Sequence, residues 1–452
     1  MKALSYKEIR NKLIINTKEF IFDLNDKFPL VGRPLVVGWR AFCGLKFIVQ
    51  KKILKLKTRL KYNYETLDLD KVCWVNPQKI EYCLGGKFNI WRNYSRILEG
   101  DWDQSKTRFE DLDVFRAFIQ RFKEGKKWEE TDFYHRVLNQ ITKGIRKWGC
   151  RNKEEWDKRL RNIESLYYQI KRDGYKSRKE LFSPKGWLEK LEGPSITLDD
   201  ISTAIGREGE LLFIEGRHRL AIAQLLNLPK IPIRIIVRHK KWMDFRKELI
   251  CFALDDEEGK LYQPLTHSDL QDIPRHHGEL RFNIIKEHLS FTQGTLLDIG
   301  ANLGYFCHKF EEEGFDCYAV ESDRMCVYFS KKLKKAENRE FKVISGSIFE
   351  YNKNQELRFD VILALNIFHH FLGRKDTYLK LIKFLKRLRV KELFFEPPKP
   401  NRAKTKRFYR NYTPDQFVQF IINNSCLNKA ELIGEAEDGR PLYKLTCNKS
   451  PL

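Results

Sequence analysis

The stretch Thr295-Leu-Leu-Asp-Ile-Gly-Ala-Asn-Leu-Gly-Tyr-Phe306 decides the fold of the C-terminal part of this 452-residue chain. Its apolar beginning predicts a buried β-strand, and Gly300 and Gly304 predict a tight turn whose backbone passes close to a ligand. A helix is predicted to follow, and its first turn would present free backbone N–H groups to that ligand. Because many strand–helix turns contain glycine for steric reasons alone, the function depends on what accompanies this turn.

Two further features follow in the order that a ligand-binding α/β sheet requires. The predicted strand 316–320 ends in Glu321, about 20 residues beyond the turn, where a carboxylate commonly accepts hydrogen bonds from ribose hydroxyls. A further buried strand, 359–365, leads into Asn366-Ile-Phe-His-His-Phe371. The alternation of strands and helices from 294 to about 448 predicts a mostly parallel, doubly wound sheet.

With these motifs, the segment from about 294 to 448 resembles the class I S-adenosylmethionine-dependent methyltransferases. Asp298-Ile-Gly-Ala-Asn-Leu-Gly304 matches their first motif (D-x-G-x-x-x-G), Glu321 matches the ribose-binding acid, and FDVILALNIFHH at 359–370 matches the fourth motif. The resemblance implies a Rossmann-like fold and S-adenosyl-L-methionine as cofactor, with the methionine end at the glycine turn and the adenine along the loop after 346. The cofactor-binding residues that it implies are Asp298, Gly300, Asn302, Gly304, Glu321 and Ser347.

Differences from the family's usual motifs restrict the acceptor groups that are expected. The family usually carries an acid where Ser347 stands, and no N-P-P-Tyr/Phe tetrapeptide follows the fourth strand, which argues against transfer to adenine or glutamine amino groups. Methyl transfer from a sulfonium gains much of its rate from orientation, so a base is needed only if the acceptor must lose a proton. The candidate catalytic residues are Asn366, His369 and His370, although a histidine here could instead pack against or cap the next helix. The alternative is that this segment has the cofactor-binding fold but catalyses no reaction.

A second constellation lies at 211–237. The strand Leu211-Leu-Phe-Ile214 runs into Glu215-Gly-Arg-His-Arg219, and a helix over 222–226 and another strand over 231–237 follow. The helix N-terminus and the two arginines would together cradle a phosphate group. Alternatively, the arginines pair with Asp199, Asp200 or Glu210 and only stabilise the turn.

This junction resembles the ParB/sulfiredoxin-like superfamily, which carries G-x-H-R or G-E-R-R at the same place and binds nucleotide phosphates or DNA there. The likeness extends loosely back to Val72-Cys-Trp-Val-Asn-Pro77, with the helical stretch at about 100–185 as an insertion. It implies a nucleotide at this domain and a role for Glu215 as base or metal helper. No helix-turn-helix follows, which argues against centromere binding. The phosphate-binding residues that the resemblance implies are Glu215, Gly216, Arg217, His218 and Arg219.

Two segments carry nearly all of the net charge of +24. Residues 1–61 hold 15 basic and four acidic side chains, and residues 371–410 hold 14 basic and three acidic ones. Such patches attract phosphate polymers, anionic headgroups or acidic proteins, although a well-solvated surface explains them equally well. The apolar and basic residues at 46–61 predict an amphipathic arm that could contact a membrane. A span over 28–50 is excluded by three cationic side chains, Arg33, Arg40 and Lys46.

The sequence thus predicts a basic N-terminal arm (1–64), a ParB/sulfiredoxin-like α+β domain (65–240), a polar connector (241–292) and a methyltransferase domain (293–452). The ten cysteines include no Cys-x-x-Cys and no zinc spacing, which favours reduced thiols, a cytoplasmic protein and no metal site. His276 and His277 lie in the predicted connector and are expected to be solvent-exposed. The oligomeric state is not indicated.

The function that these features favour is methyl transfer to an anionic acceptor: a nucleic acid, a nucleotide-linked metabolite, or an anionic glycan or lipid. Because the basic segment 371–410 follows the fourth strand, its cations are expected to affect acceptor affinity in a salt-dependent way. One alternative is a ParB-like nucleotide hydrolase or kinase with a non-catalytic methyltransferase fold, and another is a nucleic-acid-binding protein without catalysis. The cations in question are Lys399, Arg402, Lys404, Lys406 and Arg407.

Overall fold

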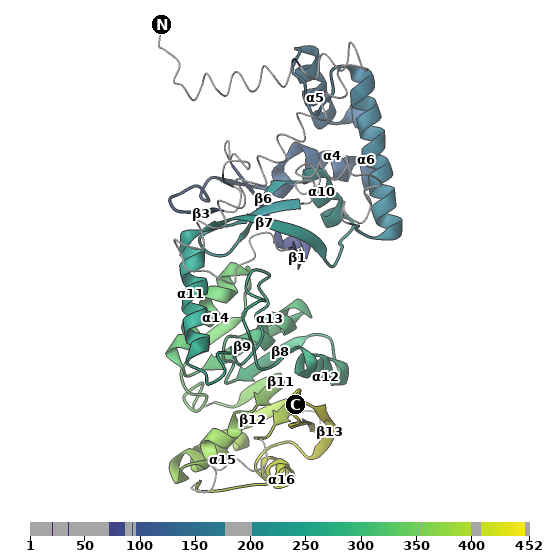
Figure 1. Cartoon of the computed structure of the whole chain (residues 1–452). Coiled ribbons are helices and arrows are strands. Elements are labelled where there is room, and N and C mark those ends of the chain that lie inside the picture. Colours follow the sequence, from purple (N-terminus) through teal and green to yellow (C-terminus); the bar gives the residue numbers. More distant parts are fainter. Residues whose placement is uncertain are drawn as a thin grey trace. The chain divides into compact units, whose positions relative to one another are not determined.

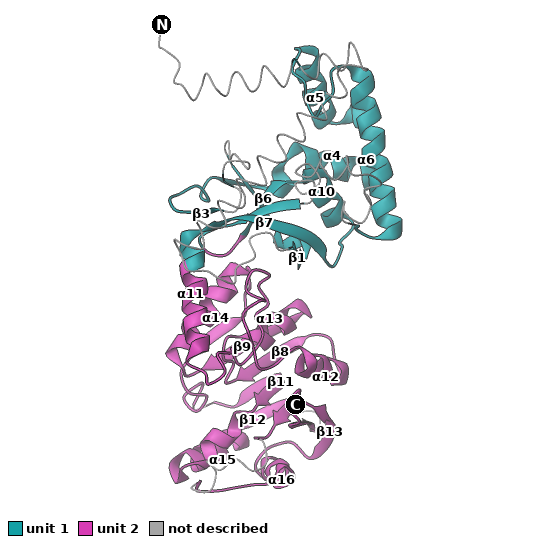
Figure 2. Ribbon diagram, viewed as in Figure 1, with its two compact units in different colours: residues 1–207, 211–243 teal, residues 208–210, 244–452 magenta. Residues whose placement is uncertain are grey.

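The computed structural model describes Phe20, Leu35, Asn93 and the ranges 72–85, 96–176, 201–353, 355–398 and 408–447. The chain divides into two units, and it passes from the first to the second between Met243 and Asp244 (Figure 2). The short segment 208–210 also belongs to the second unit. Apart from Phe20 and Leu35, the predicted N-terminal arm lies outside the described residues, as do the five cations at 399–407.

The described part of the second unit contains a seven-stranded sheet in the order β10-β9-β8-β11-β12-β14-β13. Five of these strands, β8, β9, β11, β12 and β13, are labelled in Figure 1. The first five strands in this order are parallel, and β14 runs antiparallel to both of its neighbours. The mostly parallel sheet that the sequence predicts from 294 onward is therefore confirmed, and it is Rossmann-like. Its strands are β8 (Gly294–Ile299), β9 (Phe315–Glu321), β10 (Lys342–Ser345), β11 (Leu357–Leu365), β12 (Leu388–Glu396), β13 (Lys429–Glu435) and β14 (Pro441–Thr446).

Helices cover both faces of this sheet because its strands carry apolar side chains on both faces. One buried cluster joins the strands to α12 and α13, and a second cluster joins them to α15 and α16. Successive side chains of β8 point to opposite faces of the sheet, so Leu296 belongs to one cluster and Leu297 to the other. The helices are α12 (Leu280–His288), α13 (Tyr305–Glu312), α14 (Arg324–Ala336), the 3-10 helix η4 (Phe368–Leu372), α15 (Lys375–Arg387) and α16 (Pro414–Asn424).

The segment 241–292, predicted as a polar connector, instead contains two helices, and from Asp244 onward it belongs to the second unit. Helix α11 (Lys240–Leu254) buries Trp242, Phe245 and Leu249, whose spacing of three and four residues gives one apolar face. Helix α12 buries Phe282 and Ile285 in the same way. Charged residues between these positions make the segment polar on average. The spacing of its apolar residues, and not its average composition, indicates the helices.

The first unit contains a mixed sheet in the order β1-β7-β5-β6-β2-β4, with β3 paired to β7. In the described part of the segment between β4 and β5, the chain forms α4, α5 and α6, which lie within the helical stretch that the sequence predicts at about 100–185. The strands are β1 (Val72–Val75), β2 (Tyr82–Leu84), β3 (Arg96–Leu98), β4 (Lys106–Arg108), β5 (Ile201–Ile205), β6 (Leu211–Glu215) and β7 (Ile231–His239). The helices are α4 (Asp113–Phe122), α5 (Asp132–Thr142), α6 (Lys153–Asp173) and α10 (Arg217–Leu225).

None of the helices in the described part of the chain has both the length and the apolar character needed to cross a bilayer. None of the cysteines that the structure describes forms a disulfide bond. Cys307, Cys317 and Cys326 are buried, and the first two belong to the apolar cluster that joins the strands to α12 and α13.

Candidate functional site

The carboxyl ends of β8, β9, β11 and β12 meet at one edge of the second sheet. From β8 the chain builds the sheet in one direction through β9 and β10, and later in the opposite direction through β11 and β12. Open α/β sheets bind ligands outside the carboxyl ends of their strands at the place where the strand order reverses. That place lies between β8 and β11, and the predicted cofactor motif follows β8.

The glycine turn after β8 has a backbone that only glycine adopts without strain. Gly300 has φ of 73° and Gly304 has φ of 82°, both in the left-handed region. A Cβ atom on Gly300 would lie 2.7 Å from Cδ1 of Ile367, and one on Gly304 would lie 2.8 Å from Oγ of Ser330. The turn therefore packs directly against the loop that follows β11.

Asp298, the last-but-one residue of β8, has a buried carboxyl group. Its Oδ2 atom makes no hydrogen bond to any described residue, and its side chain is only 2% exposed. Burial, with a smaller contribution from the charge of Glu321, raises the pKa of Asp298 to about 7, while Arg281 opposes the shift. A buried polar atom without a hydrogen bond costs about 1–3 kcal/mol, so this carboxyl group is suited to a cationic ligand such as an ammonium group.

Glu321, at the end of β9, has a carboxylate that the backbone holds in place. Its Oε2 accepts a hydrogen bond from the N–H of Asn302 at 2.8 Å. Its Oε1 accepts hydrogen bonds from the N–H groups of Ser322 and Asp323 at 2.6 and 2.8 Å. A carboxylate has about four acceptor positions and three are occupied, so one fixed acceptor position remains for a ribose hydroxyl.

The other predicted cofactor residues lie at the same edge. Asn302 has φ of 52° and a buried Oδ1 atom without a hydrogen bond to a described residue. Ser347 is exposed just beyond β10, and the N–H of Gly346 donates to the carbonyl oxygen of Glu321 at 2.8 Å. The structure therefore brings the predicted set together, while its role in binding stays a prediction.

The predicted catalytic residues follow β11. Asn366 has φ of 55°, and His369 and His370 lie in η4 with ring centroids 4.0 Å apart. His369 is buried, whereas His370 is exposed. Of the two imidazoles, only that of His370 is open to solvent.

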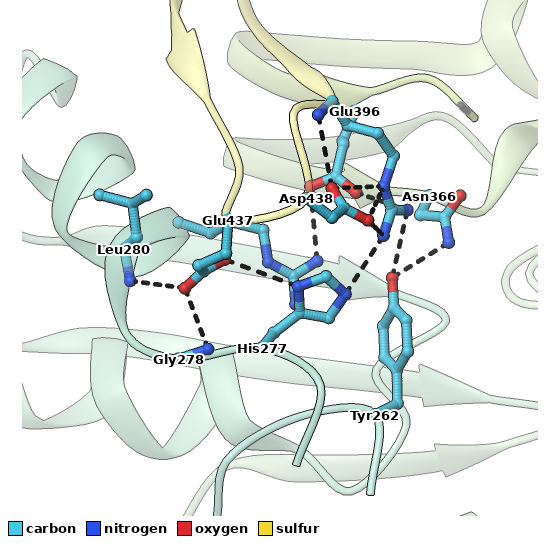
Figure 3. Close-up of polar contacts among 10 residues, drawn as sticks. Tyr262, His277, Gly278, Leu280, Asn366, Glu396, Glu437 and Asp438 are labelled. Carbon is cyan, nitrogen blue, oxygen red and sulfur yellow. Dashed lines mark hydrogen bonds and ion pairs between the residues drawn. The ribbon is translucent and has the colours of Figure 1, made fainter. Parts of the chain in front are cut away.

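A buried polar network, which the sequence analysis missed, lies beside the ends of β11 and β12 (Figure 3). Arg440, from the turn between β13 and β14, has Nη1 2.8 Å from Oε1 of Glu396 and Nη2 2.6 Å from Oδ2 of Asp438. Its guanidinium also donates to the hydroxyl of Tyr262 at 3.4 Å and contacts Nε2 of His277 at 3.2 Å. One arginine thus ties a hairpin turn, a strand end and two loop side chains together.

The expectation that His277 is solvent-exposed is wrong, because its side chain is only 3% exposed. Burial, followed by the charges of Arg281 and Arg440, lowers the pKa of His277 to about 4. Since Arg440 donates to Nε2, the proton of the neutral ring lies on Nδ1, which is 3.5 Å from Oε2 of Glu437. His276 is partly exposed and pairs with Asp256.

Arg281, on α12, is fully buried and has few partners for its donors. Its Nη1 lies 3.4 Å from Oε2 of Glu396, and its Nε makes no hydrogen bond to a described residue. The guanidinium lies over the rings of Tyr262 and Phe306, at 5.4 and 5.6 Å from their centroids. The sequence signal that could have identified it is its position four residues before the apolar Ile285, which places the two side chains on the same face of a short helix.

In the first unit, α10 begins at Arg217, directly after Gly216. Gly216 has φ of 96°, and a Cβ atom there would lie 2.9 Å from Cα of Ile201. Desolvation raises the pKa of Glu215, at the exposed end of β6, and the charge of Arg217 partly opposes this shift. The predicted junction of strand, glycine and helix is therefore present.

The side chain of His218 packs on the helical insertion. Its ring stacks on Phe118, with centroids 5.8 Å apart, and meets Trp148 edge-on at 5.5 Å. Burial lowers the pKa of His218 to about 3, so the imidazole is neutral at pH 7. Arg219 lies over the ring of Tyr175 at 5.6 Å. Among the residues predicted to bind phosphate, His218 thus has a packing role that the sequence did not indicate.

A methyltransferase-domain family model matches residues 275–408 of the chain. The second unit carries an S-adenosylmethionine-dependent methyltransferase domain. S-adenosylmethionine is accordingly the expected methyl donor of this domain, and the match covers the glycine turn, Glu321 and the loop after β11.

Several solved structures resemble the chain at low sequence identity. The bifunctional kinase-methyltransferase WbdD is 16% identical over 44% of this chain and 46% of its own, with a TM-score of 0.34. The N-methyltransferase NodS from Bradyrhizobium japonicum WM9 is 13% identical over 38% of this chain and 96% of its own, with a TM-score of 0.30. A methyltransferase from Archaeoglobus fulgidus is 15% identical over 37% of this chain and 90% of its own, with a TM-score of 0.28.

The chain thus spans less than half the length of WbdD. No curated protein matches the sequence.

Proposed function

We propose that the protein transfers a methyl group from S-adenosylmethionine to an anionic acceptor at the carboxyl edge of the second sheet. The observation that carries this proposal is the orphaned, buried carboxyl group of Asp298, which lies beside a glycine turn and near the fixed carboxylate of Glu321. The three chemical groups of the donor that need partners are an ammonium, a carboxylate and a ribose diol. The described residues offer a suitable partner to each.

S-adenosylmethionine, when bound, supplies a methyl group on a sulfonium that needs no protein nucleophile for its transfer. Asp298 would accept a hydrogen bond from the ammonium group, and the remaining acceptor position of Glu321 would accept one from a ribose hydroxyl. Arg281, whose donors are buried and underused, would hold the carboxylate. Fixing both ends of the donor orients its methyl group, and orientation is the main contribution that the protein makes.

The proton of the acceptor, where one must leave, has three candidate destinations in the loop after β11. His370 is exposed and could pass a proton to solvent, whereas His369 is buried and Asn366 has no basic atom. His277 lies nearby but is not suited to this role, because its only basic atom already accepts from Arg440 and its pKa is lowered to about 4. We therefore assign the role of base to His370.

The positive charge of 371–410 supports an anionic acceptor. In its described part, α15 exposes Lys375, Lys380, Lys383 and Lys386. An open hollow of about 770 Å³ lies at the start of this helix and is lined by Gly373, Arg374, Lys375, Asp376, Leu379 and Tyr409. An acceptor whose charge is spread over several groups would be attracted to this surface before its nucleophile reaches the site.

Calorimetric binding of S-adenosylmethionine and S-adenosylhomocysteine to the intact chain tests this proposal. We expect micromolar binding to the unsubstituted protein and a loss of roughly tenfold or more in Glu321→Gln, because a carbonyl oxygen and an amide nitrogen replace two charged acceptors. Glu311→Gln is the matched control, since its carboxylate also accepts backbone hydrogen bonds, from Glu340 and Phe341, but on a different loop. Absence of binding in the unsubstituted protein would refute the proposal.

We further propose that the first unit is ParB-like and binds a phosphate-bearing group at Gly216 and Arg217. Gly216, which precedes α10, has a left-handed backbone and no side chain to cap the helix. The first backbone N–H groups of α10 are therefore available to a phosphate group, which supports this proposal. Hydrolysis of a nucleoside triphosphate that is lost in Arg217→Ala and retained in Glu321→Gln would make this unit the active one. Binding of the nucleotide without hydrolysis would leave it a recognition module.

A further inference from the structure

The side-chain amide of Asn366 is held in one orientation. Its Nδ2 donates to the hydroxyl oxygen of Tyr262 at 3.0 Å, and its backbone N–H donates to the carbonyl oxygen of Glu396 at 2.9 Å. Its Oδ1 atom is buried and makes no hydrogen bond to any described residue. Figure 3 shows the Asn366 side chain beside the hydroxyl of Tyr262.

The orientation of this amide depends on residues far along the chain. The hydroxyl oxygen of Tyr262 also accepts from Nη1 of Arg440 at 3.4 Å, so both of its lone pairs are used by N–H donors. Arg440 is itself fixed by Asp438 and Glu396. In the structure the donor side of the Asn366 amide faces the Tyr262 oxygen, and Oδ1 makes no hydrogen bond within the network.

Oδ1 of Asn366 lies near the place where the methyl group would be transferred. Asn366 directly follows β11, and the next residue, Ile367, packs closely against the Gly300 turn. The left-handed backbone of Asn366, with φ of 55°, keeps the side chain at this edge of the sheet. A buried oxygen that lacks a hydrogen-bond partner at a binding edge is suited to accept one from a ligand.

We propose that Oδ1 of Asn366 accepts a hydrogen bond from the nucleophile of the methyl acceptor, and that Tyr262 and Arg440 act as positioning residues for it. The acceptor nucleophile must then carry a hydrogen, so it is an amine or a hydroxyl group. A carboxylate or thiolate nucleophile has no hydrogen to donate and would meet the lone pairs of Oδ1. This inference rests on the proposed function and names the acceptor class of that same site.

Sinefungin tests the inference without knowledge of the acceptor. In this analogue an amino-bearing carbon replaces the methyl sulfonium of S-adenosylmethionine, so that its N–H groups lie where the transferred methyl would be. S-adenosylhomocysteine has no group at that position but shares the methionine and ribose ends. The ratio of the two dissociation constants therefore reports a hydrogen-bond acceptor at the transfer point, and calorimetry on the intact chain measures it.

We expect Asn366→Gly, which keeps the left-handed backbone, to lower the preference for sinefungin by roughly ten- to one-hundredfold, the usual contribution of a hydrogen bond to a charged group. S-adenosylhomocysteine should bind the variant within about twofold of its affinity for the unsubstituted protein. Tyr262→Phe, which keeps the ring and removes the hydroxyl, should lower the preference in the same direction. Tyr328→Phe is the matched control, because its hydroxyl contacts Glu248 on the protein surface, and it should change nothing.

Three outcomes would overturn the inference. If Asn366→Gly leaves the ratio unchanged, Oδ1 does not face the transfer point. If it weakens both ligands equally, Oδ1 binds the methionine end that the ligands share. If the unsubstituted protein binds neither ligand, the proposed function itself fails, and this result differs from the other two. An effect of Asn366→Gly without one of Tyr262→Phe would remove Tyr262 and Arg440 from the positioning role.

Discussion

At the scale of the residue, the raised pKa of Asp298 predicts that binding of S-adenosylmethionine depends on pH. Its carboxyl group, with a pKa of about 7 instead of 3.8, is largely protonated below neutrality, whereas the ammonium group of the ligand requires the ionised form. The dissociation constant should therefore fall by up to about tenfold per pH unit as pH rises toward 7, and should level off above it. Calorimetry between about pH 5.5 and pH 8.5 measures this dependence.

The Asp298→Asn variant provides the control for that pH dependence. It should bind S-adenosylmethionine more weakly and with no comparable slope, since its amide does not titrate. In the ligand-free protein the same raised pKa acts on folding: the contribution of Asp298 to stability is complete below pH 3.8 and is lost as pH rises through about 7. If the Asp298→Asn variant keeps the full pH slope, the titration belongs to a different group.

The sequence could reveal the site residues that lie close together in one short motif, but not those that come from distant parts of the chain. Asp298, Gly300 and Gly304 lie within seven positions and constrain one another through a single turn, so their pattern predicts both geometry and ligand. Tyr262, His277 and Arg440 are brought together only by tertiary packing, and no short motif connects them. His277 looks exposed in sequence because the residues that bury it, Tyr262 and Arg440, come from a loop and a hairpin turn.

At the scale of the element, the glycine turn predicts a difference between two Gly→Ala variants. Gly300 and Gly314 both have positive φ, 73° and 97°, so alanine at either position carries a backbone strain of roughly 1–2 kcal/mol. Only at Gly300 does the new Cβ collide, at 2.7 Å from Ile367, whereas at Gly314 the nearest atom is 3.7 Å away. Gly300→Ala should therefore displace the loop after β11 and weaken S-adenosylhomocysteine binding by roughly tenfold or more.

Gly314→Ala, before the amino end of β9, should leave that affinity within about twofold while lowering the melting temperature. Calorimetry and thermal unfolding measured together separate the two effects. Equal losses of affinity in both variants would mean that general destabilisation, and not the contact with Ile367, weakens binding.

The hairpin of β13 and β14 shows how one element can depend on another that is distant in the sequence. Strand-like alternation identifies such strands locally, but the turn between them supplies Glu437, whose carboxylate accepts from the N–H groups of Gly278 and Leu280 at the start of α12. Helix α12 has no side-chain cap within its own sequence, which weakened its signal in a polar segment. Because the residue that caps α12 lies far along the chain, the local sequence lacks a helix start signal and the segment was predicted to be a connector.

At the scale of the whole molecule, the two basic segments predict salt-dependent attraction of polyanions. Replacing Lys399, Arg402, Lys404, Lys406 and Arg407 by Gln removes five positive charges from 371–410. If these cations contact phosphates, the slope of log affinity against log salt should become shallower by roughly four, because each contact releases most of one counterion. Fluorescence anisotropy with a labelled single-stranded oligonucleotide, used as a generic phosphate polymer, measures the slope.

A control with the same net charge decides whether position matters or only total charge. Lysine-to-glutamine changes at five scattered positions of the second unit, Lys260, Lys309, Lys331, Lys335 and Lys429, lower the charge by the same amount outside the basic segment. Long-range attraction would weaken similarly in both variants, but only direct contacts change the number of released counterions. An equal slope in the two variants would show that 399–407 does not contact the polymer, and the acceptor would then be sought among ligands small enough to be held by the site at β8 and β11 alone.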